Sequence, residues 1–82
     1  MLKIANSQPV AIIDVRSKQE YKEGHIDGAI NIPLFDIKRD IQTYVADKNT
    51  IVILYCDAGV RSRKAQKILI SLGYRNAYNL EL

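Results

Sequence analysis

Residues 51–62 decide the fold of this chain, and they read Ile51-Val52-Ile53-Leu54-Tyr55-Cys56-Asp57-Ala58-Gly59-Val60-Arg61-Ser62. The first five are apolar without polar alternation, which predicts a strand buried on both faces, as in a parallel sheet covered by helices. The glycine-containing segment after Cys56 leads into a predicted helix that begins at about Arg61 or Ser62 and ends at Gly73. Apolar residues recur along that helix at helical spacing, at Ala65, Ile68, Leu69 and Leu72.

Short apolar runs elsewhere in the chain predict further strands. They cover residues 11–15, 29–32 and 74–80. Pro33 ends the second of these strands because proline has no N–H to donate to a ladder. Strand patterns that alternate with helix patterns predict right-handed βαβ units. The predicted fold class is therefore α/β, with a small parallel sheet of four to five strands flanked by helices.

Two further helices are predicted before the central strand. Ser17 and Glu20 have the spacing of a capping box, which predicts a helix that runs to about Glu23. Asp36 can cap the second helix. The predicted buried face of that helix carries Ile37, Ile41, Tyr44 and Val45.

The composition predicts one globular domain over residues 1–82. Hydrophobic residues make up 48% and charged residues 26%, which excludes collagen-like and largely disordered classes. No apolar run approaches the roughly 20 residues of a membrane-spanning helix, so no membrane partner is predicted. A single cysteine excludes an internal disulfide. The amino terminus has no apolar run of the signal-peptide kind, so two locations stay open: cytoplasmic as written, or periplasmic if a leader has been removed.

Basic residues gather around the cysteine. The formal net charge is +3, from 12 Lys and Arg against 9 Asp and Glu. Residues 56–75 carry five basic residues against Asp57 alone, which gives this segment a charge of +4. Aromatic residues are not interleaved with these basic residues, so nucleic-acid binding is not predicted. The local basic field favours a small anionic ligand instead.

Cys56 follows the predicted central strand, at the edge where ligands bind in open parallel sheets. Backbone N–H groups of the next residues can point at its sulfur if the loop curls around it, and Gly59 leaves room for that turn. The start of the following helix and the charge of Arg61 also favour an anion. These features predict a reactive thiolate with a pKa below the ordinary value of about 8.5. A buried structural cysteine is the alternative interpretation.

The candidate site has a nucleophile, a loop and a structural support. Cys56 is the candidate nucleophile. The loop predicted to bind substrate and stabilise a charged sulfur consists of Asp57, Ala58, Gly59, Val60, Arg61 and Ser62. One cysteine and one histidine cannot close a four-ligand site, so no metal is predicted.

Asp14 and Arg16 lie at the end of the first predicted strand, on the same side because they are two residues apart. They either line the pocket or brace it from within, and an internal brace is the preferred interpretation. His25 could act as a base, but a role in positioning its turn is preferred.

Three motifs of this chain resemble the signatures of rhodanese domains. They are Ile13-Asp14-Val15-Arg16, then Gly24-His25-Ile26-Asp27-Gly28-Ala29-Ile30-Asn31-Ile32-Pro33, then Tyr55-Cys56-Asp57-Ala58-Gly59-Val60-Arg61-Ser62. The closing Leu72-Gly73-Tyr74 and Asn79-Leu80 are also similar to that family. The motifs occur in the family's order, and the compact length resembles that of single-domain rhodaneses of the phage-shock protein E type.

The resemblance implies a sulfurtransferase that uses a Cys56 persulfide and needs no metal or organic cofactor. Its implied partners are a small anionic sulfur donor, such as thiosulfate, and a sulfur acceptor. The acceptor is cyanide in vitro and a thiol in the cell, and a protein is a further possible acceptor. A rhodanese-like module that carries sulfur or senses redox state without rapid turnover is the alternative. Phosphatases and arsenate reductases of related type are disfavoured, because the phosphatase loop is Cys-x5-Arg whereas four residues separate Cys56 from Arg61.

One departure from the family concerns the carboxyl terminus. Rhodanese domains usually continue past the Asn-Leu segment into a Gly-Gly turn and a further helical stretch, whereas this sequence ends Asn79-Leu80-Glu81-Leu82. Both a minimal protein and a shortened sequence agree with this ending, and both predict a pocket that lacks one wall.

Overall fold

The computed structural model describes residues 2–3 and 9–80. Its strands are β1 (Leu2–Lys3), β2 (Pro9–Asp14), β3 (Ile30–Asn31), β4 (Ile51–Tyr55) and β5 (Ala77–Asn79). Its helices are α1 (Lys18–Glu23), α2 (Ile37–Tyr44) and α3 (Val60–Ser71), with a 3₁₀ helix, η1, over Leu34–Asp36. The signal-peptide prediction rests largely on residues outside the described part, and the chain's last two residues also lie outside it. No helix in the described ranges is long and apolar enough to cross a bilayer.

The sheet is built on parallel pairing, which confirms the predicted α/β fold. β4 lies between β2 and β5 and runs parallel to both, with Ile53 opposite Ile12 and Tyr78. β3 runs parallel to the end of β2. The sequence reasoning missed β1, a two-residue strand that pairs antiparallel with the start of β2.

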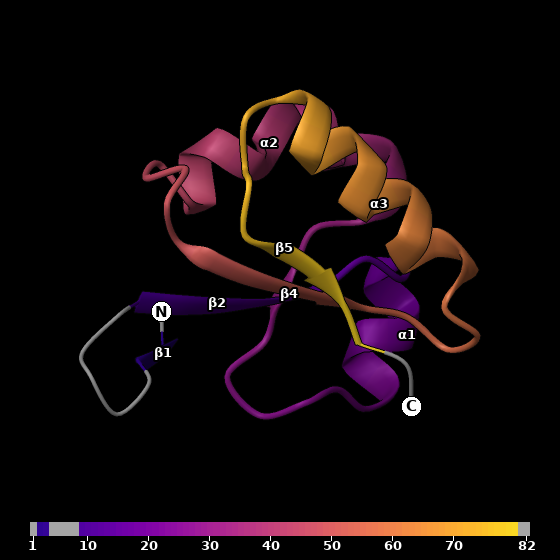
Figure 1. Cartoon of the computed structure of the whole chain (residues 1–82). Coiled ribbons are helices and arrows are strands. Elements are labelled where there is room, and N and C mark those ends of the chain that lie inside the picture. Colours follow the sequence, from indigo (N-terminus) through magenta and orange to yellow (C-terminus); the bar gives the residue numbers. More distant parts are fainter. Residues whose placement is uncertain (1, 4–8, 81–82) are drawn as a thin grey trace.

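Helices α2 and α3 lie on one face of the sheet, while α1 lies near the carboxyl ends of the strands (Figure 1). Apolar side chains of α2 and α3 pack with those of the sheet into one buried cluster. Within β4, Val52 and Leu54 are fully buried, whereas Ile51 and Ile53 on the other face are half-buried. Tyr55, on the same face as Ile51 and Ile53, is buried with 3% exposure. The prediction of burial on both faces therefore holds only in part, because the second face is fully buried only at Tyr55.

The helix starts agree in part with the predictions. The predicted capping box of α1 is present, because Ser17 Oγ accepts from the Glu20 N–H at 3.2 Å and Glu20 Oε1 accepts from the Ser17 N–H at 3.1 Å. α3 begins at Val60, slightly before the predicted start. Asp36 precedes α2 but does not cap it with its side chain as predicted, because η1 already gives Asp36 a helical backbone. Its carboxylate instead lies 3.4 Å from the Arg39 guanidinium.

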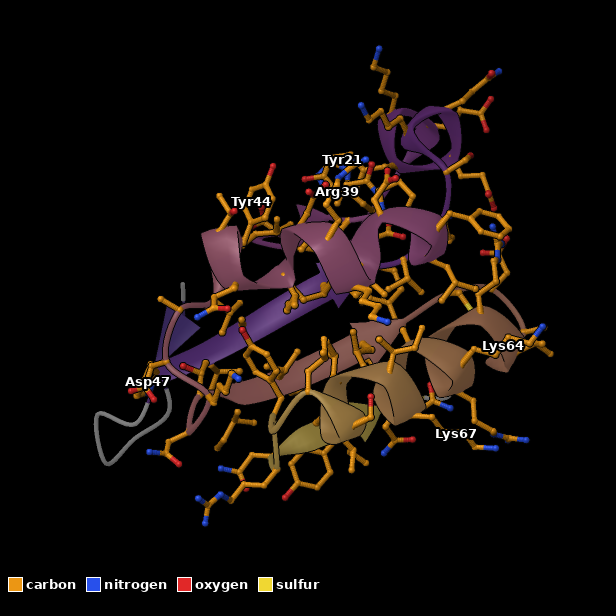
Figure 2. The ribbon with its side chains drawn as sticks, turned by 90° about the horizontal axis from the view of Figure 1, so that it is seen from above. Tyr21, Arg39, Tyr44, Asp47, Lys64 and Lys67 are labelled. Atoms are coloured by element: carbon orange, nitrogen blue, oxygen red, sulfur yellow. The ribbon has the colours of Figure 1, made fainter. Side chains whose placement is uncertain are left out.

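Two predictions near the ends of elements are wrong. Tyr44 is the last residue of α2, is 49% exposed and points away from α3 (Figure 2), whereas the helical spacing predicted it to be buried. The last strand begins at Ala77 rather than at Tyr74. Tyr74 instead enters the core, where its hydroxyl donates to the Val45 carbonyl at 2.6 Å.

Candidate functional site

Cys56 directly follows β4, at the edge of the sheet to which the carboxyl ends of β2 and β5 also point (Figure 1). The pairing of β4 with its two neighbours places Asp14 opposite Tyr55 and Asn79 opposite Leu54. Two polar side chains from neighbouring strands thus come to the edge at which the cysteine lies. Cys56 itself is buried, with 3% exposure.

Two backbone N–H groups of the loop donate to the Cys56 sulfur. The distance to Sγ is 3.2 Å from the Gly59 nitrogen and 3.4 Å from the Ser62 nitrogen. Gly59 has φ +82°, a left-handed conformation that favours glycine, and this turn directs the chain into α3. Burial raises the pKa of the Cys56 thiol, but hydrogen bonds from Ser62, Gly59 and the Arg61 backbone outweigh that effect and bring the pKa below its ordinary value.

The side chain of Ser62 links the cysteine to the last strand. Its Oγ lies 3.4 Å from Cys56 Sγ and donates to Asn79 Oδ1 at 2.5 Å. The Asn79 amide nitrogen lies 3.4 Å from the Gly59 carbonyl oxygen, to which it donates. Sequence reasoning missed Asn79 as a member of the site. The available signal was the parallel pairing of the last strand with β4, which brings Asn79 level with the residues just before Cys56.

Arg61 does not present a free charge to the sulfur, because α1 supplies a carboxylate to it. The guanidinium binds Glu20 through Nη1–Oε1 at 2.7 Å and Nη2–Oε2 at 3.0 Å. Arg61 holds the pKa of the Glu20 carboxyl well below its usual range, so this carboxyl is ionised. The charge predicted from Arg61 is therefore balanced by Glu20, which the sequence identified only as a capping residue.

Asp14 and Arg16 form a second ion pair, which extends to the residue before the cysteine. Arg16 Nη2 lies 2.8 Å from Asp14 Oδ2, and its Nε lies 3.0 Å from Oδ1. The Tyr55 hydroxyl donates to Asp14 at 2.8 Å and accepts from the Ile26 N–H at 3.0 Å. Asp14 is fully buried, and burial alone raises the pKa of its carboxyl. The hydrogen bonds from Arg16 and Tyr55 lower that pKa by more, so it falls below the usual value. Arg16 also donates to the Gly24 carbonyl at 2.6 Å.

The other predicted loop residues lie toward solvent. Asp57, Ala58 and Val60 are exposed, and Asp57 Oδ1 lies 3.4 Å from Arg16 Nη1. His25 is not brought to the sulfur by any contact in the described part of the chain. Its ring stacks on Tyr21 at 3.6 Å between centroids, and its Nδ1 lies 2.7 Å from the Tyr21 carbonyl oxygen.

Two basic residues of α3 lie at the surface of the protein. Lys64 and Lys67 point outward from α3 (Figure 2), and both are exposed. Among the residues that the structure describes, no group of three His, Cys, Asp or Glu side chains could hold a metal ion. The same residues enclose no separate cavity beside the loop.

Comparison with known sequences gives a family and several relatives. The model of the rhodanese-like domain matches residues 1–82. Thiosulfate sulfurtransferase PspE of Escherichia coli is 48% identical over 67 residues, which cover 82% of this chain and 64% of PspE. A tRNA uridine(34) hydroxylase of Buchnera aphidicola is 36% identical over 88 residues, which cover 99% of this chain but 26% of the hydroxylase. The chain thus spans less than two thirds of the length of these curated relatives.

Comparison with solved structures gives the same fold. A rhodanese from E. coli described as containing anions has a TM-score of 0.85 and 44% identity, with 88% of this chain and 85% of that chain covered. The human single-domain sulfurtransferase TSTD1 has a TM-score of 0.74 and 28% identity, with 94% of this chain and 78% of that chain covered. The parallel sheet and its helices are therefore a rhodanese-like α/β fold.

Proposed function

This chain belongs to the rhodanese-like domain family, and from that membership we propose that it is a sulfurtransferase with Cys56 as the nucleophile. The observation that carries the proposal is the pair of backbone N–H groups at 3.2 and 3.4 Å from the Cys56 sulfur. They favour negative charge at that sulfur, which the thiolate carries, and in a persulfide the charge lies on the terminal sulfur bonded to it. The similarity to PspE supports thiosulfate as the donor.

The reaction proceeds in two displacements on sulfur. The Cys56 thiolate attacks the outer sulfur of thiosulfate, a new S–S bond forms, and the old S–S bond breaks with its electron pair leaving on sulfite. The product is a Cys56 persulfide anion held against the N–H groups of Gly59 and Ser62. An acceptor, either cyanide or a thiolate, then attacks the terminal sulfur, and the electron pair of the breaking bond returns to Cys56 as thiolate.

The loop and its support have separate parts in this reaction. The N–H groups of Gly59 and Ser62 are fixed dipoles aimed at the reacting sulfur, in the manner of an oxyanion hole. Asp57, Ala58 and Val60 form the exposed side of the loop, at which a donor arrives. In the part of the chain that the structure describes, Asp14 and Arg16 make no contact with the sulfur, and their part is to hold the ends of β2 and β4.

Mass measurement of the intact protein tests the proposal directly. After incubation with thiosulfate and removal of excess donor, the protein gains the mass of one sulfur atom, and Cys56→Ser does not. Added cyanide then removes that mass and yields thiocyanate. Wild-type protein that takes up no sulfur from thiosulfate would overturn the proposed activity.

A sulfur carrier that does not turn over rapidly is the second candidate, because the family match names a rhodanese-like domain and not a rate of turnover. Sulfur uptake without thiocyanate release would select this candidate. Hydrolysis of an aryl phosphate without sulfur uptake would instead indicate a phosphatase. Several relatives are named as tRNA hydroxylases. Hydroxylation is not proposed for this chain, because the shared segment is about a quarter of the length of those proteins.

A further inference from the structure

The hydroxyl of Ser62 has one proton and two neighbours that can accept it. Cys56 Sγ lies 3.4 Å from Oγ on one side, and Asn79 Oδ1 lies 2.5 Å from it on the other. A serine hydroxyl donates one hydrogen bond and accepts others through its lone pairs. The sulfur and the amide oxygen therefore compete for the same proton.

The geometry of Asn79 shows which side holds the proton. A separation of 2.5 Å suits an O–H···O bond and is too short for N–H···O, so the amide oxygen faces Ser62. The amide nitrogen faces the Gly59 carbonyl at 3.4 Å, where a second oxygen would be repelled. With the proton directed to Asn79, a lone pair of Ser62 Oγ faces the sulfur and accepts from a neutral S–H.

This arrangement does not suit an ionised sulfur. A lone pair beside a thiolate is repelled, whereas an O–H directed at it forms a charge-assisted bond. We propose that Asn79 is a positioning residue that holds the Ser62 proton away from Cys56 while the sulfur is neutral and yields it when the sulfur becomes negative. The hydroxyl rotates and no covalent bond changes. Ser62 has 0% exposure, so bulk water does not supply the missing donor.

The inference concerns the charge state of Cys56 and goes beyond sulfur transfer. It predicts that Asn79 raises the pKa of the thiol relative to a chain without that amide, since ionisation must break the bond between Ser62 and Asn79. The charged groups around the sulfur are Arg61 with its partner Glu20, Asp57, and the pair of Asp14 and Arg16. None of them contacts Asn79 among the described residues, so substitution of Asn79 leaves their pairing in place.

The rate at which neutral iodoacetamide alkylates Cys56, measured against pH, tests the inference. The thiolate is the reactive form, and the chain has one cysteine, so the midpoint of the profile is the pKa of that thiol. In Asn79→Ala the sulfur is the acceptor that remains for the hydroxyl among its contacts with the described residues. We expect the midpoint to fall by roughly half to one unit, which makes alkylation about three- to tenfold faster below both midpoints.

Two further variants separate positioning from a general structural effect. Ser62→Ala removes the hydroxyl proton for which the sulfur and Asn79 compete. The double variant with Ser62→Ala and Asn79→Ala should therefore have the same midpoint as Ser62→Ala alone. Asn76→Ala is the matched control, because Asn76 also binds a backbone carbonyl, that of Asn49 at 3.0 Å, and lies before β5 rather than at its end. Its midpoint should equal that of the wild type.

The inference is overturned if Asn79→Ala leaves the midpoint unchanged or raises it, or if its shift persists when Ser62 is alanine. Asn79→Asp provides a readout should the alanine variant not fold: a carboxylate accepts the proton more strongly, so the midpoint should rise, and by less when Ser62 is alanine. Because these profiles use an alkylating reagent, they are obtained whether or not the protein takes up sulfur. Failure of sulfur transfer and failure of this inference are therefore distinguishable.

Discussion

Two arginine–carboxylate pairs lie near the cysteine loop, and they differ in burial. In the inner pair, Asp14 has no exposed side-chain surface and Arg16 has 12%. In the outer pair, the side chains of Glu20 and Arg61 are 29% and 37% exposed. A buried pair strongly destabilises a protein when one partner is removed, whereas a pair in contact with water contributes little to stability. The inner pair therefore holds the strand ends in position, and the outer pair sets the charge at the loop.

The largest effect is expected from breaking the inner pair. Asp14→Asn removes the charge that compensates Arg16 and weakens the bond from Tyr55. We expect the free energy of unfolding, measured by urea denaturation, to fall by about 2–3 kcal/mol. The matched control is Asp40→Asn, which breaks the exposed pair between Asp40 and Arg39 (2.8 Å). This substitution should change the free energy of unfolding by less than about 0.5 kcal/mol. Equal losses in the two variants would contradict the role of burial.

Acid should weaken the same inner pair. The pKa of Asp14 in the folded protein lies below its value in the unfolded chain, about 3.9. The pair therefore contributes its stability above that pH and loses it as the pH falls through the folded pKa. Between about pH 4 and pH 2, the wild type should lose more unfolding free energy than Asp14→Asn. Parallel losses in the two proteins would show that Asp14 titrates normally.

The outer pair should instead affect the sulfur donor. Glu20→Gln keeps a capping side chain for Ser17 but leaves the charge of Arg61 unbalanced, so an anionic donor is attracted more strongly. We expect the KM for thiosulfate to fall about threefold at low salt, and the change to shrink as salt is added. The unfolding free energy should change by less than about 1 kcal/mol.

Glu23→Gln is the matched control for this measurement, because it removes one negative charge from the same helix. Glu23 takes part in no ion pair in the described ranges of the chain. Its substitution should leave the KM for thiosulfate near the wild-type value. A KM that responds equally to both substitutions would assign the effect to net charge rather than to Arg61.

The smallest effect is expected from Asp57, which contacts both arginines from outside. Its side chain is 67% exposed, and it lies 3.4 Å from Arg16 and 3.8 Å from Arg61. We expect Asp57→Asn to change the unfolding free energy by less than about 0.5 kcal/mol and the KM for thiosulfate by less than Glu20→Gln does. A larger change in KM would make Asp57, not Glu20, the main balance to Arg61.

The sequence predicted the features that depend on local order. The apolar run 51–55 became the central strand, and the capping box at Ser17 and Glu20 formed as expected. The turn at Gly59 also follows from neighbouring residues, since it connects a strand directly to a helix. Tyr44 shows the limit of periodicity, because a residue that ends a helix can face solvent even at the spacing of the buried face.

The features that were missed depend on contacts between distant residues. Glu20 and Arg61 are 41 positions apart, and so are Asp14 and Tyr55. No local pattern states which acidic side chain will meet Arg61. The pairing of Glu20 with Arg61 requires α1 to lie near the start of α3, and the place of Asn79 follows from the register of β5 on β4. Such contacts need the fold before they can be assigned.

The pKa of Cys56 in the wild-type protein is the most direct test of the site. Following the β-carbon NMR resonance of this single cysteine against pH gives the value without any reagent. Donation from the loop amides to the sulfur predicts a midpoint below the ordinary value of about 8.5. A midpoint at or above that value would mean that burial outweighs those bonds, and that this thiol is not built for sulfur transfer.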